Sequence, residues 1–411
     1  MRKPELRYKL ARNFTLMGAN EFLAALRLFY PISILYFSEI TGSFTTSMGV
    51  FSVATITMAI LEVPTGILSD KWGRRNLLIM GCLLEFLATL AYALGGTSFL
   101  FNGTIWLYIG GILFGMAGSL FSGNNYALLY ETAQSLRQRH RLSHILGRNA
   151  SMEQLGLALA SAAGGGLLWF GTGFDTLVWL TLIPMGLAIV TAIMVMEPPR
   201  HSISESNAWN HMKEALHLLI TNKQLRLLTL CSGWKTGWGL ASHSLMPKFI
   251  EMVWPLWAVP FYRFGQNLVG FVSYWLAGKV TDKLTPLKTL VGASFLSDVI
   301  SVISVSLANL FSPFLLFITQ FNWAVGNTAN DTLQQHQFSA EQRSTMGSLI
   351  SLTISIINAL AALALGLIAD TFGVTTALIC TAIITMPVAL GYFKLYQTDK
   401  KTLQNNAQHA R

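Results

Sequence analysis

The sequence predicts an all-α membrane protein, with twelve transmembrane helices in two pseudo-symmetric six-helix bundles. Three observations support this prediction. First, 52% of the 411 residues are apolar and only 11% are charged, whereas soluble domains carry about 25% charged residues. Second, the apolar residues gather in runs near the ~20 residues that a helix needs to cross ~30 Å of hydrocarbon. Third, short features of the first half return in the same order in the second half.

The apolar runs give the boundaries of the spans to within a few residues. We expect them at about 13–37, 47–68, 77–96, 104–128, 149–170, 176–196, 224–247, 255–278, 288–308, 313–334, 346–369 and 375–396. The longest polar segment, Glu197–Asn222, divides them six and six. We therefore expect bundles at 1–196 and 223–411, joined by a cytoplasmic loop at 197–222. In that loop, the apolar spacing of Trp209–Ile220 predicts an amphipathic helix on the membrane surface.

The basic residues predict the orientation. The formal net charge is +9, and most basic side chains lie in the two tails and in loops on the same side of the predicted spans, whereas Lys248 lies on the other side. The positive-inside rule then places both termini in the cytoplasm of a multi-pass cell (inner) membrane protein. This rule explains the basic excess without a nucleic-acid partner, so we expect the lipid bilayer as the surroundings and no bound nucleic acid.

The two halves repeat each other. Gly66–Lys71 returns as Gly278–Lys283, and Tyr130–Gln134 returns as Asn330–Gln334. Three glycines also have counterparts, which pair as Gly147 with Gly347, Gly166 with Gly366 and Gly173 with Gly373. Three features in the same order indicate two bundles related by a pseudo-twofold axis.

A short basic loop joins spans 2 and 3. Residues 66–75 read Gly-Ile-Leu-Ser-Asp-Lys-Trp-Gly-Arg-Arg, and a basic loop this short between two membrane-length runs is typical of a cytoplasmic hairpin. Gly73 suits a turn that needs a positive φ. The stretch closely resembles the signature of the major facilitator superfamily, Gly-x-Leu-x-Asp-(Arg/Lys)-x-Gly-Arg-(Arg/Lys). The resemblance implies that spans 1, 4, 7 and 10 line a central cavity, while spans 3, 6, 9 and 12 lie outside.

The resemblance also implies a cytoplasmic gate. In the superfamily an acid at the end of span 4 pairs with the loop arginines, and the loop aspartate caps span 11. Carried over, Glu131 would meet Arg74 or Arg75, and Asp70 would meet the backbone around 344–348, near Arg343. The expected gate residues are Gly66, Asp70, Gly73, Arg74, Arg75, Glu131, Asp282, Asp331 and Arg343. Ordinary solvated surface charges are the alternative interpretation.

Charged side chains inside the spans are costly and are therefore functional candidates. Asn13, Asn20 and Arg27 recur every seven residues, which predicts a polar stripe along span 1. The cavity and proton-site candidates are Asn20, Glu21, Arg27, Glu62, Lys235 and Trp238, with Glu21 and Glu62 as the candidate proton carriers. Two interpretations stay open: these charges contact substrate and protons, or they pair with one another to fix the bundle.

Two further acids are near the middle of spans 3 and 9. Glu85 and Asp298 are one residue from equivalent in the repeat. Because the resemblance places these spans at the periphery, a structural role is favoured for both.

The chain also departs from one group within the superfamily. Many proton-coupled drug exporters carry an arginine in span 4 where this chain has Gly111, and a proline near the glycines of span 5 where it has Ala162–Gly166. Gly111 and Gly115 instead form a Gly-x-x-x-Gly packing face. These departures weaken a drug–proton antiport assignment and leave the predicted fold unchanged.

The function that we predict from these features is secondary active transport. The chain has no Walker-type phosphate loop, no nucleophile constellation and no metal-ligand spacing, so we expect no enzyme activity, no cofactor and no metal. We expect a monomer that moves a small organic solute by alternating access, with H+ as coupling ion and export favoured. The alternatives are an uptake symporter or uniporter for a metabolite or siderophore and, in another class, a non-transporting membrane receptor or assembly factor.

Overall fold

The computed structural model describes residues 3–97, 102–199, 219–336 and 343–409, and the regular elements within these ranges are helices. Most of the predicted surface helix at Trp209–Ile220 lies outside the described residues. The chain divides into two compact units, which are described separately. The first is Met1–Ser204 with Pro255–Phe264, and the second is Glu205–Trp254 with Gly265–Arg411.

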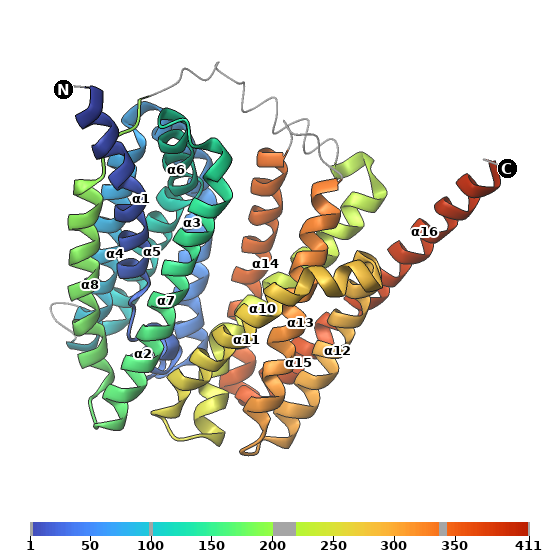
Figure 1. Cartoon of the computed structure of the whole chain (residues 1–411). Helices are drawn as coiled ribbons and strands as arrows, with labels where there is room; N and C mark the ends of the chain where they lie inside the picture. Colours follow the sequence, from blue (N-terminus) through green and yellow to red (C-terminus); the bar gives the residue numbers. More distant parts are fainter. Residues whose placement is uncertain (1–2, 98–101, 200–218, 337–342, 410–411) are drawn as a thin grey trace. The chain divides into compact units, whose positions relative to one another are not determined.

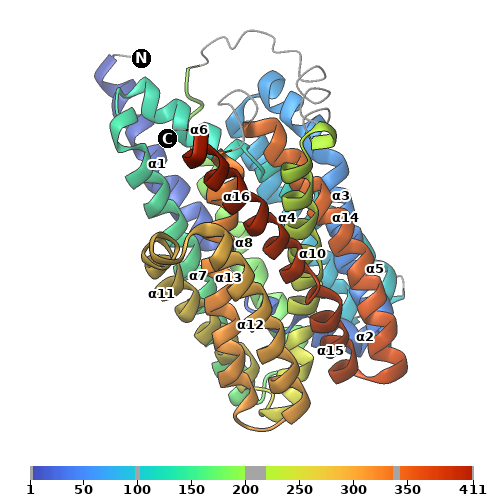
Figure 2. The same cartoon turned by 90° about the vertical axis from the view of Figure 1, so that its right-hand side faces the viewer.

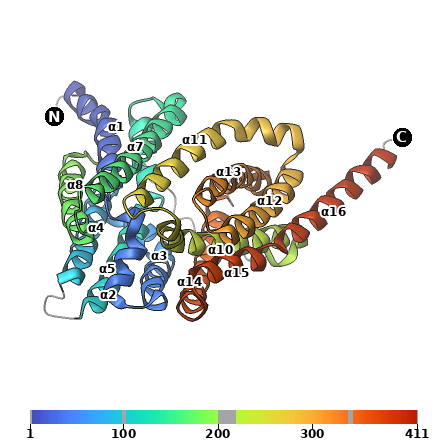
Figure 3. The ribbon, with the colours of Figure 1, turned by 90° about the horizontal axis from the view of Figure 1, so that it is seen from below.

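Long helices that run side by side build the first unit (Figure 1). They are α1 (Lys3–Ala25), α2 (Ser33–Thr41), α3 (Phe44–Trp72), α4 (Arg74–Thr97), α5 (Gly103–Phe121), α6 (Asn124–Ser135), α7 (Leu142–Trp169) and α8 (Phe174–Met194), with 3-10 turns η1 (Tyr30–Ile32) and η2 (Arg139–Arg141). Helix α1 packs against α7 and α8, α4 packs against α5 and α8, and α3 packs against α5, as the end-on view in Figure 3 shows. One apolar core lies between α1, α4, α6 and α8.

The second unit is built in the same way (Figure 2). Its helices are α10 (Lys223–Val253), the greater part of α11 (Ala258–Leu284), α12 (Pro286–Leu307), α13 (Ser312–His336), α14 (Arg343–Phe372), α15 (Val374–Thr385) and α16 (Val388–His409). Helix α10 packs against α14, α15 and α16, and α12 packs against α13, α15 and α16. Apolar side chains of α10, α12, α13 and α16 form its larger core.

The helices are long enough and apolar enough to cross a membrane. Eight described segments are both long and apolar enough to do so. Four further helices, α7, α10, α11 and α13, have 28, 31, 27 and 25 residues, which is long enough to span while carrying more polar side chains. Together they account for the twelve predicted spans, and the all-α membrane fold is confirmed.

The surface of the helices is apolar where lipid would touch it. On α8, Ile183, Leu187 and Val190 are exposed, while Met185 and Ala188 on the opposite face are buried. A soluble bundle would place polar side chains on the outer face. An apolar face on both sides is typical of a helix in a bilayer.

Three predicted spans are interrupted. Span 4 breaks at Ser122 and Gly123, where Gly123 has φ 70°, and the last span breaks before Pro387, which has no N–H to continue the helix. Span 1 ends as a helix at Ala25 and resumes after Pro31. The predicted span at 13–37 is confirmed within Arg7–Thr41, but its helix is broken between Ala25 and Tyr30.

The turn between spans 2 and 3 has the predicted left-handed conformation. Gly73 has φ 96°, and Thr285, at the equivalent place between α11 and α12, has φ 66°. A β-branched residue at positive φ is strained, whereas glycine adopts this conformation freely. Both halves therefore have a positive φ at this turn, but the second half has threonine where the first has glycine.

The two turns should respond oppositely to substitution. We expect Gly73→Ala to destabilise the protein by about 1 kcal/mol, because alanine is strained at this φ. Thr285→Gly should raise the stability by up to about 1 kcal/mol, because it removes strain. Thermal denaturation of the detergent-solubilised protein measures both, and a fall in melting temperature for Thr285→Gly would contradict the assignment of strain.

The predicted glycine packing face is also confirmed. A Cβ atom on Gly115 would lie 2.3 Å from the carbonyl oxygen of Ala54, and one on Gly111 would lie 2.9 Å from that of Val50. Both neighbours belong to α3. The absence of side chains at these two positions therefore lets α3 and α5 approach backbone to backbone.

Candidate functional site

A buried ion pair joins the first and third spans of the first unit. The Arg27 guanidinium, in the break after α1, pairs with the Glu85 carboxylate of α4, whose side chain is only 3% exposed. Arg27 Nε also donates to the carbonyl of Ala24, at 2.9 Å, and the guanidinium lies over the rings of Phe114 and Tyr30. Arg27 therefore lies beyond the helix on which its predicted polar stripe depends, and the stripe does not extend to it.

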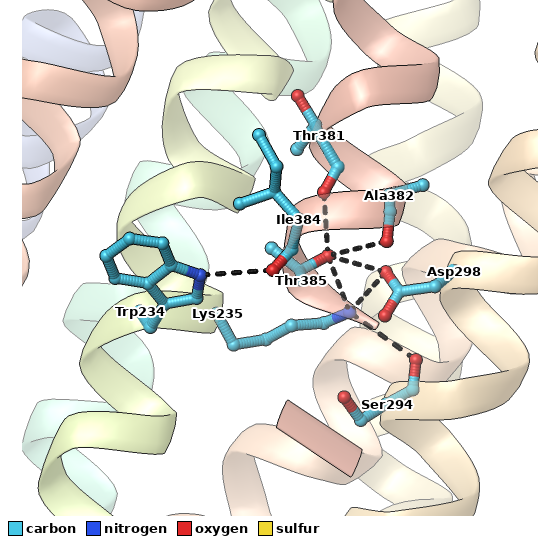
Figure 4. Close-up of polar contacts among 8 residues, drawn as sticks. All are labelled: Trp234, Lys235, Ser294, Asp298, Thr381, Ala382, Ile384 and Thr385. Atoms are coloured by element: carbon cyan, nitrogen blue, oxygen red, sulfur yellow. Dashed lines mark hydrogen bonds and ion pairs between the residues drawn. The ribbon is translucent and has the colours of Figure 1, made fainter. Parts of the chain in front are cut away.

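The second unit contains a corresponding pair. Lys235 Nζ of α10 lies 2.5 Å from Asp298 Oδ1 of α12, and the Asp298 side chain is 6% exposed. Thr385, the last residue of α15, donates its hydroxyl to the same oxygen at 2.8 Å. Figure 4 shows Lys235 also reaching the carbonyl of Ser294, at 3.4 Å. Each unit thus places a cation from its first span against an acid from its third span.

The two cations are paired within their own units rather than with each other: Arg27 with Glu85, and Lys235 with Asp298. Both acids stand out in the sequence, where a structural role is favoured for them, but their pairing with the two cations was not predicted. The signal available was their near-equivalence in the repeat.

Removing one member of the first-unit pair should cost more than removing both. Glu85→Gln leaves the Arg27 charge without its partner in an apolar bundle, and we expect a loss of about 3 kcal/mol in the free energy of unfolding. The double variant Arg27→Met with Glu85→Met should recover most of this loss. Denaturation in detergent of the two single variants and the double variant measures the coupling, and strictly additive losses would show that the pair is not buried.

The two candidate proton carriers converge on the break in span 4. Asn125, at the start of α6, donates to Glu21 Oε1 at 3.0 Å. Ser122, just before the break, lies with its hydroxyl 3.5 Å from Glu62 Oε1. Carboxylates from α1 and α3 therefore bond to residues on either side of Gly123, an arrangement that sequence analysis did not foresee.

Asn20 lies in the packed interior of the first unit. Its amide nitrogen is 2.8 Å from the carbonyl oxygen of Ala188 and 3.0 Å from the Thr191 hydroxyl, both on α8. Its stripe neighbour Asn13 likewise donates to the carbonyl of Met196 and accepts from its N–H. These bonds tie α1 to the end of span 6.

Lys235 and Trp238 share the predicted face of α10, with Trp234 beside them. The rings of Trp234 and Trp238 lie 5.9 Å apart, and the Trp234 indole N–H donates to the carbonyl of Ile384 at 3.2 Å. Trp238 is half-buried. The aromatic pair is thus anchored to α15 next to the ion pair.

The predicted contact between Glu131 and the loop arginines is confirmed. Arg74 Nε lies 3.1 Å from Glu131 Oε1, and Asn124 donates to the carbonyl of Arg74. Arg75 donates instead to the carbonyl of Ile193 at 2.7 Å.

Glu197 is a further acid of this network, and its place at the start of the predicted central loop gave no sign of this contact. Glu197 accepts the backbone N–H groups of Arg74 and Arg75, at 2.9 and 2.7 Å. A carboxylate on the first amides of α4 caps that helix and complements its dipole.

The structure describes only part of the remaining gate candidates. The side chains of Asp70, Asp282 and Arg343, and the surroundings of Gly66, lie outside the described residues. Asp331 is exposed near the end of α13. The predicted cap from Asp70 onto span 11 therefore stays a prediction.

Removal of the Glu197 carboxylate should loosen the start of α4. We expect Glu197→Ala to accelerate hydrogen exchange of the Arg74 and Arg75 amides about tenfold, since capping and dipole interactions together contribute about 1–2 kcal/mol. Exchange measured by mass spectrometry on peptides covering 70–80 tests this expectation. Glu153→Ala, at an exposed acid on α7, is the matched control, and equal exchange in both variants would rule out the cap.

Comparison with known proteins places this geometry in a class. The helical membrane fold, the paired units and the basic hairpin after α3 define an integral membrane transporter fold. The family model of the Major Facilitator Superfamily matches residues 17–338. The chain belongs to this superfamily.

Solved structures share the fold at low sequence identity. A bacterial homolog of the human lysosomal transporter Spinster matches with a TM-score of 0.74 and 14% identity, covering 98% of this chain and 99% of that one. The nucleoside transporter NupG gives a TM-score of 0.79 and 10% identity, with 93% and 100% covered. A D-xylose-proton symporter gives 0.70 and 14%, with 93% and 97% covered. No curated protein matches the chain by sequence comparison.

Proposed function

We propose that the protein is a proton-coupled secondary transporter that moves a small organic solute by alternating access. The observation that carries this proposal is the pair of carboxylates, Glu21 and Glu62, bonded to the two sides of the break in span 4. Ionisable groups inside spans are costly and commonly belong to ion pathways. Protonation of either acid would change its bond exactly where the helix is already interrupted, so proton binding and helix movement would be linked.

The proton supplies a useful driving force. One charge moving down ~100 mV releases about 2.3 kcal/mol, which corresponds to about a fiftyfold solute gradient. To keep protons and solute from crossing without being coupled, the transporter needs a gate on the cytoplasmic side. We assign that role to the Arg74–Glu131 pair and the Glu197 cap, with Asp70, Asp282, Asp331 and Arg343 as its further members by resemblance.

We also propose a class of solute and a direction of transport. Few charges and several aromatic side chains in the spans favour an amphipathic or modestly charged organic compound, exported by a monomer in the inner membrane with both termini cytoplasmic. The D-xylose-proton symporter and the nucleoside transporter among the similar structures make proton-coupled uptake of a polar metabolite the second candidate. Membership of a transporter superfamily makes an enzyme or a non-transporting receptor the weaker reading.

Proton movement in vesicles tests the proposal. Inverted membrane vesicles acidified inside are offered a panel of lipophilic cations, neutral amphipathic drugs, nucleosides and sugars, and the lumenal pH is followed with a fluorescent dye. An exported compound should release lumenal protons in wild type, and Glu21→Gln or Glu62→Gln should abolish that release because the proton carrier is lost.

Matched controls separate the roles. Glu39→Gln, at an exposed acid at the end of α2, should behave as wild type, and Asp70→Asn should slow transport without removing proton release per solute. Right-side-out vesicles test uptake with the same panel. Labelled solute that equilibrates without any proton movement would disprove proton coupling.

A further inference from the structure

The Asp298 carboxylate has one oxygen that accepts two hydrogen bonds and one that accepts none among the described residues. Asp298 Oδ1 receives Lys235 and Thr385, whereas Oδ2 is buried and has no hydrogen-bond partner among the described residues. The hydroxyl of Ser294 is likewise buried and unpartnered, and it lies one turn earlier on the same face of α12. A buried carboxylate oxygen without a donor is costly, and a proton on Oδ2 would remove its negative charge.

We propose that Asp298 is an additional proton-binding group, in the second unit, besides Glu21 and Glu62 of the first, and that Lys235 transmits its protonation to the break in the last span. The proposal rests on the proton-coupled transport proposed above. The proton binds Oδ2, only the Oδ2–H bond forms, and Lys235 keeps its own proton. The charge of the pair then rises from zero to one.

The added charge has a mechanical consequence. Neutral Asp298 no longer balances the ammonium, and an unbalanced charge in the bundle interior is strongly unfavourable. Lys235 is 17% exposed and sits on a flexible stem, so its ammonium can withdraw toward a more polar environment. The remaining partners of Nζ, the carbonyl of Ser294 and the hydroxyl of Thr385 at 3.4 Å, are too weak to hold it.

Withdrawal of Lys235 acts on the break between α15 and α16. Thr385 ends α15, Pro387 prevents continuation, and the carbonyl of Ile384 is satisfied by Trp234, the neighbour of Lys235 on α10 (Figure 4). Two consecutive residues of α10 thus hold the end of α15. Movement of one changes the packing of the other, which couples the charge on Asp298 to the position of the last span.

The cation of the first unit has more contacts that do not depend on its acid. Arg27 stays protonated under all conditions, and it is held by the Ala24 carbonyl and by the rings of Phe114 and Tyr30 as well as by Glu85. Neutralising Glu85 would leave these contacts in place. The Arg27–Glu85 pair is therefore a fixed structural link, and the lysine pair is the exchangeable one.

Lys235 is the charged partner of Asp298 among the described residues. The other described titratable side chains on the helices packed against α12 are Lys223, Arg226, Cys231, His243, Lys248 and Glu251 of α10, Asp331 of α13, Cys380 of α15, and Tyr392, Lys394 and Tyr396 of α16. Within the described residues, Lys235 and Thr385 are the partners of the Asp298 carboxylate.

Infrared spectroscopy of the full-length protein in lipid tests the proposal without any solute. Acid-minus-alkaline difference spectra report the carbonyl stretch of protonated carboxylic acids. We expect a component of this band to disappear in Asp298→Asn and to remain in Glu85→Gln, the matched acid of the first unit. In Lys235→Met the acid band should persist at alkaline pH, because the balancing charge is gone.

A milder variant keeps the test decisive if Asp298→Asn does not fold, as judged from the amide band of the same spectrum. Thr385→Val removes one hydrogen bond to the carboxylate and no charge, and should move the midpoint of the band by about one pH unit in the alkaline direction. An unchanged band in Asp298→Asn, or an unmoved midpoint in Thr385→Val, would overturn the proposal. Such a result would leave solute transport and the roles of Glu21 and Glu62 untouched, since these are measured separately in vesicles.

Discussion

A charge in the interior of a membrane bundle must find its counter-charge within the protein, and the interior of this protein is arranged around that constraint. Isolated charges in hydrocarbon cost several kcal/mol. Arg27 meets Glu85, and Lys235 meets Asp298. Each pair joins the first span of a unit to its third span, so electrostatic balance and helix packing depend on each other.

The polar contacts gather where helices are interrupted. Arg27 lies in the break after α1, Glu21 and Glu62 bond around the break at Gly123, and Thr385 ends α15. A broken helix frees carbonyl and amide groups that lipid cannot satisfy, so side chains must do so. The same breaks are also the places where a helix can bend at least cost, which is why ionisable groups there link charge to shape.

The two units share a plan and differ in chemistry. The left-handed turn is occupied by Gly73 in one and by Thr285 in the other. An arginine over the rings of Phe114 and Tyr30 in one corresponds, among the described residues, to a lysine whose partners are oxygen atoms in the other. The two units therefore share the placement of the charge and of the turn, while the residues at these places differ.

Much of the fold could be predicted from the sequence, because hydropathy and loop charge act locally. The hairpin with Gly73 and the Gly111–Gly115 packing face follow from short patterns, and the Arg74–Glu131 contact follows from the family resemblance. The ion pairs did not, because a seven-residue stripe assumes an unbroken helix and Pro31 interrupts span 1. Glu197 was missed because its partners are backbone amides of a distant helix, which leave no signature in its own segment. The pairing of Glu21 with Asn125 likewise depends on a break that hydropathy does not reveal.

The break in the last span also bears on how the chain is built. Trp234 and Lys235 are synthesised well before Thr385, and they contact the carbonyl of Ile384 and the hydroxyl of Thr385. Pro387 lacks the N–H that would bond the carbonyl of Ile383 in a continuous helix. The contacts that hold the end of α15 to α10 can therefore form only after the last span has been synthesised, so the second unit is completed by its final segment.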